Sequence, residues 1–551
     1  MKKTVGILLA VLGLLLSAAG VAGIVLIGSD NTIESPSSTL KIGDAKAVVS
    51  TPGLLAYTDT TMRITAESSG GSVFVGQAHP VDVTSYLDGA PTYAVTSVGT
   101  SGVSGEAVEG DAKAAPPDPT KQTFWTESTS GAGSQTLQLA LDGKPTTYVV
   151  MPLGKPGDIT MSSGVVIPGG FGLAIGALIL GVLLLIGGIV LARRRRTPSG
   201  PDDAAVNRPA ADAPAGRAPT GADEPAGART LSRAVTVSVL ALTVPALAGC
   251  GVVPQKVEPW KNSEVTKPSM TPDQADLVLK DLATRRNAIA KATATSNDAR
   301  PWRDVSSGPL YTTEVLQSQY RQMTKTSEKS VVSLVGTKSY IPAFSGYPMY
   351  ALVAGTEAYD KGKPIEVLNV VQRTSVIAPW TMLAAAHVPA KSLPASAAPG
   401  GASTPGPEQQ KQALAAANAV MARINTGKGG PALPKELESF LSDMRTTEGA
   451  SSLVRAQLWP SDAEPLEPGG PVQAVATPTG SLVLASYDLL NTQTANPGKV
   501  FRDNPESSYR KATQQTGNQE IVRYRLAVMV AMTVDKQGKP TVIGFDQVPV
   551  R

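Results

Sequence analysis

The sequence VVIPGGFGLAIGALILGVLLLIGGIVLARRRR occupies residues 165–196. The part from Val165 to Ala192 carries no charged side chain, and a helix needs about 20 apolar residues to cross the roughly 30 Å hydrocarbon layer of a membrane. Four arginines, Arg193 to Arg196, follow directly, as is typical of the cytoplasmic flank of a membrane helix. We therefore predict a transmembrane helix at 165–192. Its glycines Gly172 and Gly176 form a small-xxx-small pattern that favours close approach of a second helix, although glycine is also common in membrane helices generally.

Two further apolar runs flank this helix. Val5 to Ile27 follows Lys2 and Lys3 and is long enough to span, so we predict an uncleaved anchor at 1–27, with a cleavable signal peptide as the alternative. Ala234 to Gly249 is short for a span and has the length of a signal core.

The basic residues predict the orientation of these runs. Lysines 2 and 3, the four arginines and the arginines of 208–233 all fall on one side, which the positive-inside tendency places in the cytoplasm. Residues 28–164 and 251–551 are then extracytoplasmic, and the Pro/Ala/Asp/Gly-rich segment 193–233 is a disordered cytoplasmic linker.

The composition excludes several kinds of site. Cys250 is the single cysteine, so an intramolecular disulfide and a cysteine-cluster metal site are excluded. The two histidines, His79 and His387, read as a turn residue and a strand end. The net charge of +4 is small for 551 residues and gives no argument for a nucleic-acid partner.

Residues 28–164 predict a small antiparallel β-sandwich. Short alternating or β-branched runs recur, and Asp142-Gly143 between two of them is a hairpin signal. No helical period of useful length is present. The expected strands are 62–66, 72–76, 124–126, 136–141 and 147–151.

These residues also resemble a recurring membrane-anchored extracytoplasmic protein of actinobacteria, of unknown function. The matching pieces are VFVGQAHPVDVTSYLDG from Val73, FWTESTSGAGSQTLQL from Phe124 and TTYVVM ending at Met151, followed by the Gly-rich span. The resemblance covers roughly residues 50–196 and implies an anchored domain with no catalytic residues to carry over.

Residues 251–390 and 408–551 predict two α+β units, joined by a Pro/Ala/Gly/Ser-rich linker at 391–407. The first helix starts at a Thr271 cap followed by Pro272, and the second ends at Gly427. Strands are expected at 331–335, 349–354, 365–371, 380–383, 482–485, 521–534 and 541–545. Helix first and an antiparallel meander later is the order of cystatin-like and nuclear-transport-factor-like folds, and the units resemble them in that pattern.

Leu247-Ala248-Gly249-Cys250 closes the third apolar run, which follows Arg229 and Arg233. Basic flank, apolar core and small residues before a cysteine resemble a bacterial lipoprotein signal, and the second half resembles actinobacterial lipoproteins of unknown function. The resemblance makes Cys250, at the end of the 234–250 segment, the candidate lipid attachment site. The alternative is a chance cysteine at the end of a membrane helix.

The search for chemistry gives no catalytic, cofactor-binding or metal residues. No Walker loop, HExxH or Gly-x-Ser-x-Gly spacing occurs. Four aromatic residues of the first α+β unit are candidates for a pocket, with core packing as the commoner fate: Tyr340, Tyr347, Tyr350 and Trp380.

We therefore expect a non-catalytic protein of the cell envelope, a surface binding or assembly module at the cell membrane. Its expected partners are the lipid bilayer and an envelope protein or cell-wall component, with no cofactor. Two alternatives stay open: an envelope hydrolase or transferase with an unrecognised site, and a fusion of a membrane protein with a lipoprotein.

The lipoprotein-like signal predicts cleavage between Gly249 and Cys250, with acyl chains on the new N-terminal cysteine. Two or more chains give stable membrane anchoring, whereas one gives marginal binding. Labelled-fatty-acid incorporation and mass spectrometry should find a lipidated C-terminal fragment in the wild type and an unlabelled full-length chain in Cys250→Ala. A single unlabelled full-length band in the wild type would leave a plain third membrane helix.

Overall fold

The computed structural model describes residues 2–111, 115–193, 255–256, 265–293, 298–325, 331–359, 362–396, 404–502 and 507–550. The chain has a mixed α+β fold and divides into two compact units. The N-terminal unit comprises residues 1–78, 90–115 and 125–260. The C-terminal unit comprises residues 261–551 together with two short segments from the first part of the chain, 79–89 and 116–124.

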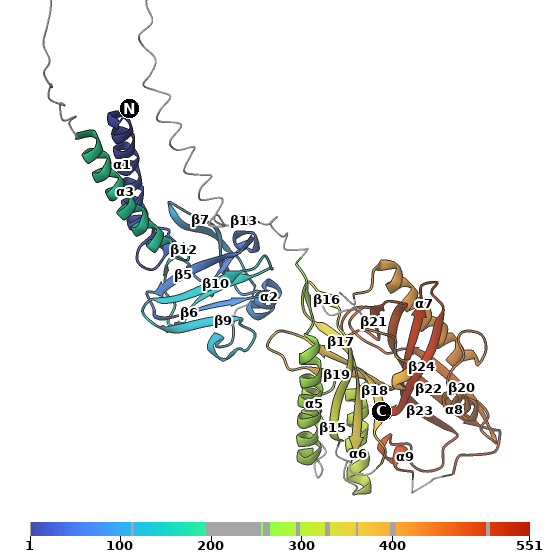
Figure 1. Cartoon of the computed structure of the whole chain (residues 1–551). Coiled ribbons are helices and arrows are strands. Elements are labelled where there is room, and N and C mark those ends of the chain that lie inside the picture. The colour runs from blue at the N-terminus through green and yellow to red at the C-terminus, as the bar shows by residue number, and fades with distance from the viewer. Residues whose placement is uncertain are drawn as a thin grey trace, which may run out of the picture. The chain divides into compact units, whose positions relative to one another are not determined.

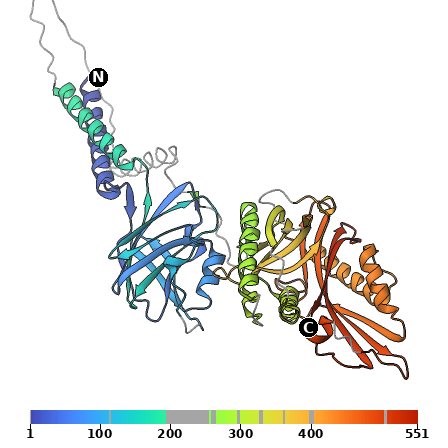
Figure 2. The same ribbon diagram turned by 90° about the horizontal axis from the view of Figure 1, so that it is seen from below.

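Two long apolar helices belong to the N-terminal unit. Helix α1 (Lys2–Ile27) and helix α3 (Gly170–Arg193) lie side by side in Figures 1 and 2. Within the described residues, these are the two helices long and apolar enough, by length and composition, to cross a membrane. Their large apolar side chains are mostly exposed, as lipid contact would require.

Glycines bring the two helices into backbone contact. A Cβ atom placed on Gly13 would lie 2.4 Å from the backbone nitrogen of Leu185, and one on Gly181 would lie 2.5 Å from that of Ser17. Gly172 and Gly176, by contrast, have nothing within 4 Å of such an atom. The predicted pairing face is therefore wrong, because Gly181, on a different face of α3 from Gly172 and Gly176, makes the close contact.

Two β-sheets follow between these helices. Their inward side chains share one apolar core that includes Ile64, Val75, Leu139 and Tyr148. One sheet holds β1 (Thr32–Glu34), β2 (Ser38–Leu40), β5 (Thr60–Ser68), β10 (Gln135–Leu141) and β12 (Ile159–Val166). The other holds β3 (Ala47–Ser50), β6 (Gly71–Ala78), β7 (Thr92–Gly99), β8 (Gly102–Val108), β9 (Glu127–Ala132) and β11 (Thr147–Gly154).

The sandwich differs from expectation in three details. Strands β3 and β7 pair in parallel, so the sandwich is not wholly antiparallel. Asp142-Gly143 does not close a hairpin, because β10 pairs with β5 while β11 pairs with β3 and β6 in the other sheet. The turn, with Gly143 at φ +77, passes the chain from one sheet to the other. Residues 124–126 precede β9 and are not a strand.

One further short pairing closes this unit. Strand β4 (Tyr57–Thr58) pairs antiparallel with β13 (Gln255–Lys256). The two strands come from opposite sides of α3 in the sequence, so the N-terminal unit also draws on residues that follow the third apolar run.

The C-terminal unit is built on one antiparallel sheet of nine strands. Its first half packs helices α5 (Pro272–Thr293) and α6 (Gly308–Thr324) against strands β15 (Val331–Tyr340), β17 (Met349–Tyr359), β18 (Ile365–Arg373) and β19 (Thr381–His387). Its second half packs α7 (Pro407–Thr426) and α8 (Lys435–Arg445) against β20 (Ala450–Leu458), β21 (Val472–Thr477), β22 (Gly480–Ala495), β23 (Ile521–Asp535) and β24 (Pro540–Val550). In Figure 2 the first half is drawn in green to yellow and the second half in orange to red.

The two halves join edge to edge and share a core. His387 of β19 pairs with Phe545 of β24 at the seam. One apolar cluster contains Leu368 and Val370 from the first half together with Leu484 and Met529 from the second. Helix-first order in both halves agrees with the sequence pattern, whereas α6, β20 and β21 were not expected. Short elements complete the unit: β14 (Lys267–Pro268) pairs with β16 (Ala343–Phe344), and α9 (Ser508–Ala512) follows β22.

The segment 79–89 contains a helix that the sequence interpretation missed. Helix α2 (Pro80–Leu87) starts at a proline and is capped by His79, so His79 is a helix cap rather than a simple turn residue. Two turns are too few to show a helical period, and this is why the pattern was read as non-helical. The other segment holds the 3₁₀ turn Pro119–Lys121.

The helix contact predicts that Gly181→Leu separates α1 from α3, whereas Gly176→Leu leaves them paired. A side chain on Gly181 would collide with the α1 backbone, and overpacking typically costs about 1–3 kcal/mol. The measurement is the disulfide yield between Gly23→Cys and Ala174→Cys in a Cys250→Ser background, since a Cβ on Gly23 lies 2.9 Å from the Ala174 Cβ. Equal yields in the two leucine variants would contradict this packing.

Candidate binding cavity

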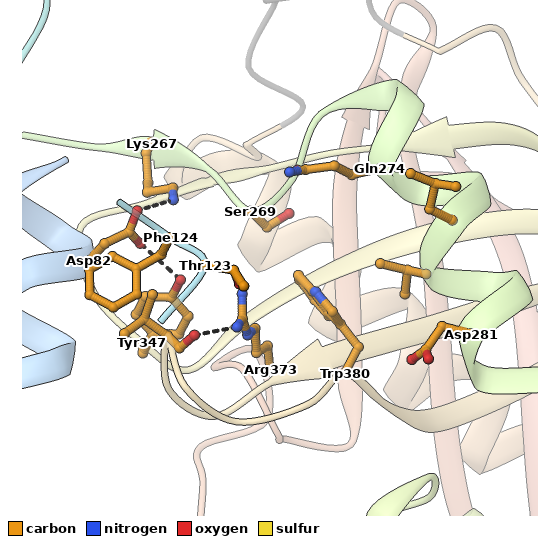
Figure 3. A pocket seen from close by; sticks show the side chains of 13 residues that line it. Asp82, Thr123, Phe124, Lys267, Ser269, Gln274, Asp281, Tyr347, Arg373 and Trp380 are labelled. Carbon is orange, nitrogen blue, oxygen red and sulfur yellow. Dashed lines mark hydrogen bonds and ion pairs between the residues drawn. The ribbon is translucent and has the colours of Figure 1, made fainter. Parts of the chain in front are cut away.

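A cavity of about 380 Å³ opens in the C-terminal unit. Its wall comes from α2, the 116–124 segment, the start of α5 and the loops that precede β17 and follow β18. Asp82, Lys267 and Tyr347 gather at one end of the cavity, and Trp380 and Asp281 lie at the other (Figure 3). The remaining lining residues are Thr123, Phe124, Ser269, Gln274, Leu277, Val278, Arg373 and Val376.

Asp82 is the buried anion of this cavity. It lies in the first turn of α2 and is 4% exposed. Its carboxylate accepts a hydrogen bond from Lys267 Nζ at 2.6 Å and another from the Tyr347 hydroxyl at 2.9 Å (Figure 3). Burial, together with the Asp82 charge, raises the pKa of Tyr347, so this phenol stays protonated as the donor.

Further contacts fix α2 beside the cavity. The backbone N–H of Val376 donates to Ser85 Oγ at 3.0 Å. The Tyr86 hydroxyl donates to the Pro117 carbonyl, and its ring packs at 5.3 Å from that of Phe124. These bonds join chain segments that are far apart in sequence, so they hold α2 within the C-terminal unit.

Arg373 supplies a cation that is held by carbonyl groups. At the end of β18, its Nε donates to the Ala378 carbonyl at 2.7 Å, and its Nη2 donates to the Val376 carbonyl. Burial lowers the pKa of Arg373, and the nearby Tyr347 and Asp82 oppose that shift. Asp281 across the cavity pairs with Arg285 at 2.8 Å. Among the described residues, Arg373 forms no ion pair with a carboxylate.

Ser269 places a hydroxyl without a partner in the cavity wall. The residue is 7% exposed, and its Oγ has no hydrogen-bond partner in the described part of the chain. It lies two residues before the cap of α5, where Thr271 N donates to Gln274 Oε1 at 2.9 Å and Gln274 N donates to Thr271 Oγ1 at 3.3 Å. This is the predicted capping pair, and it fixes the backbone that carries Ser269.

His79 is a half-buried, neutral neighbour of this site. Its Nδ1 accepts from the Val81 N–H at 3.3 Å, which caps α2. Burial and the positive charge of Lys267 lower the pKa of His79 to about 4, and Asp82 opposes the shift. The imidazole is therefore uncharged at neutral pH.

The aromatic residues singled out from the sequence divide into two pairs. Tyr347 and Trp380 line the cavity. Tyr340 and Tyr350 are core residues, and their hydroxyls donate to the carbonyls of Pro394 and Ala474, each at 2.6 Å. Packing in the core was the commoner fate expected, and it holds for the second pair.

The other singled-out residues lie elsewhere. His387 is the last residue of β19, as the strand-end interpretation expected, and its Nδ1 is 4.0 Å from Asp546. Burial raises the pKa of Asp546. Cys250 lies outside the described residues. In the described part of the chain, no group of three His, Cys, Asp or Glu side chains is placed to hold a metal ion.

The cavity residues other than Tyr347 and Trp380 escaped the sequence interpretation, and among them are the polar residues Asp82, Lys267, Ser269 and Arg373. No motif links them, because each comes from a different element and 291 positions separate the first from the last (373 − 82). Asp82 carried one local signal, since an acidic residue near the start of a Pro-led helix is favoured by the helix dipole.

Comparison with known proteins identifies one domain. A family model described as a domain of unknown function (DUF8094) matches residues 266–453. No curated protein and no solved structure is found to match the chain. The match starts one residue before β14 and ends inside β20, whereas the nine-stranded sheet continues to β24.

The lowered pKa of His79 predicts that the stability of the folded chain depends on pH. In the unfolded chain His79 takes up a proton near its ordinary pKa of 6.5, and in the folded chain only near pH 4. Its stabilising contribution is therefore complete above pH 6.5 and is lost as the pH falls toward 4, with a loss of about 2 kcal/mol between pH 7 and pH 5.

The check is chemical denaturation of the wild type, His79→Asn and His387→Asn between pH 7.5 and pH 5. Asparagine keeps a capping acceptor, so His79→Asn should lose less stability over this interval than the wild type. His387→Asn serves as the matched control, because that side chain is 48% exposed. An unchanged pH slope in His79→Asn would refute the burial of a neutral imidazole here.

Proposed function

We propose that this chain is a membrane-anchored, non-catalytic binding and assembly protein of the cell envelope, with both units on the outer side of the membrane. The observation that best supports this proposal is which chain segments make up the C-terminal unit. It combines residues 79–89 and 116–124 with residues after 261. Helix α3 lies between these parts in the sequence.

A single compact unit occupies one side of a membrane. If α1 and α3 both cross, residues 79–124 and the residues directly after α3 are on opposite sides. The bonds from Lys267 and Tyr347 to Asp82 then require the chain to return to the first side before residue 267. The third apolar run, 234–249, is the sequence available for that return, and it lies outside the described residues.

The N-terminal unit independently requires that the chain return to the first side of the membrane. Strand β4 precedes α3, and strand β13 follows the third apolar run, yet Lys256 pairs with Tyr57. The basic residues after α3 favour the cytoplasm for residues 193–233. Together these observations support an outer location for both units.

The contacts of α2 also support the alternative of two joined proteins. Cleavage between Gly249 and Cys250 would produce two chains, and Asp82 and Ser85 of the first would still bind Lys267, Tyr347 and Val376 of the second. An assembly role follows in either case, because the first part of the chain completes the cavity of the C-terminal unit.

The cavity supports binding more than catalysis. A hydrolase or transferase needs a nucleophile within hydrogen-bonding reach of a base. Ser269 Oγ has no such partner among the described residues, and His79 Nδ1 is occupied by the Val81 N–H. A pre-formed concave site with a few polar groups on an apolar wall is the usual form of a ligand site.

The topology predicts that cysteines placed at Ser130 and Ser451 react with a membrane-impermeant maleimide in intact cells, whereas one at Ala211 reacts only after lysis. Ser130 and Ser451 are exposed positions in the two units. Cys250→Ser provides a background free of cysteine, because the native chain has one. Protection of Ser451→Cys in intact cells, with labelling after lysis, would overturn the outer location of the C-terminal unit.

A further inference from the structure

We infer that the cavity binds a small organic monoanion, a single carboxylate on a compact apolar body. This inference deepens the proposed binding function and rests on it. Three features of the cavity carry it: a guanidinium without a carboxylate ion pair among the described residues, a buried hydroxyl without a hydrogen-bond partner there, and a limited volume with a few apolar side chains in a mostly polar lining.

The guanidinium is the anchoring group for the carboxylate. Lys267 is neutralised by Asp82 at 2.6 Å, whereas Arg373 is held only by carbonyl oxygens among the described residues. Its Nη1 makes no hydrogen bond in that part of the chain. The planar fork of a guanidinium matches a carboxylate in a bidentate pair.

Ser269 provides a second, independent indication of a ligand. A buried hydroxyl left without a partner costs roughly 1–3 kcal/mol, and native structures rarely retain one. Its Oγ is buried in the cavity wall beside the first turn of α5, a helix of 22 residues, where the helix dipole favours negative charge. A ligand carboxylate oxygen would accept this hydrogen bond.

The remaining wall limits the rest of the ligand. Trp380, Val278 and Val376 supply apolar contact, and about 380 Å³ is near the lower end of the usual range for ligand sites, about 300–1,000 Å³. An apolar body about the size of one aromatic ring fits this space.

The carboxylates of the wall set the charge of the ligand. Asp82 at one end and Asp281 at the other oppose a second negative charge. This favours a monocarboxylate over inorganic phosphate, which carries more negative charge at neutral pH, and over a nucleotide, which is also too large.

The test is isothermal titration of the purified full-length chain with phenylacetate, and with benzyl alcohol and inorganic phosphate as comparison probes. We expect phenylacetate to bind and the two comparison probes to bind at least roughly tenfold more weakly. Benzyl alcohol cannot form the charge-assisted pair, which is worth that factor or more, and the lining carboxylates Asp82 and Asp281 oppose the additional negative charge of phosphate. Arg373→Gln should weaken phenylacetate binding between about tenfold and a hundredfold, and Ser269→Ala by about threefold to tenfold. Arg303→Gln, an exposed arginine outside the cavity, is the matched control and should bind as the wild type does.

The thermal midpoint of each variant separates lost binding from lost folding. Should Arg373→Gln fail to fold, Ser269→Ala carries the test, because it removes one unpartnered atom. Absence of phenylacetate binding, equal binding by Arg373→Gln or Ser269→Ala, or equal binding of phosphate or benzyl alcohol would overturn the ligand class. The proposed function would survive such a result if the cysteine-labelling topology holds, so the two failures are distinguishable.

Discussion

The carboxylate of Asp82 joins parts of the chain that α3 separates in the sequence. An ionised carboxylate moved out of water without partners costs several kcal/mol, so its burial requires donors. Lys267 and Tyr347 supply them, and both come from the matched DUF8094 region whereas Asp82 does not. Removing either side would leave a buried group unpaired, which is more destabilising than the loss of an exposed ion pair. This interaction, together with the contacts of Ser85 and Tyr86, holds α2 in the C-terminal unit.

Of the two cations that line the cavity, Asp82 pairs with one and leaves the other without a carboxylate ion pair among the described residues. Lys267 and Arg373 are both partly buried in the wall. The short distance from Lys267 to Asp82 neutralises one charge, and the carbonyls of Val376 and Ala378 orient the other without neutralising it. Arg373 is therefore the lining cation that carbonyl oxygens hold, and the apolar side chains of Trp380 and two valines line the same cavity. Lys267 also acts on His79, because burial of the imidazole and the nearby Lys267 charge together lower the pKa of His79.

Local signals in the sequence predicted the elements, and the long-range contacts escaped prediction. The apolar run of α1, the Thr271–Gln274 cap and the Gly427 end of α7 each depend on neighbouring residues, and each occurs as expected. The helix predicted at 165–192 also occurs, but it starts at Gly170 because Val165 and Val166 belong to β12. The error at Asp142-Gly143 arose because a turn signal specifies a change of direction and not the strand that is paired next. Of the cavity residues, only two were predicted from the sequence as pocket candidates, the aromatic residues Tyr347 and Trp380. Ser269 and Arg373 gave no signal, because a missing partner is a property of the folded chain.

The contacts constrain the number of membrane crossings more firmly than the composition of the third apolar run does. That run is short for a span and ends like a lipoprotein signal, so its sequence fits both an uncleaved helix and a cleaved signal. Both fates deliver the residues after Cys250 to the side that holds Asp82 and Tyr57, provided α1 and α3 cross. A cytoplasmic C-terminal unit would instead break the Asp82 pair and the β4–β13 pairing together. The two pairings come from different units and share no residue, and both support the proposal that the C-terminal unit lies on the same side of the membrane as residues 28–164. Whether a lipid or a helix holds it there is a separate question.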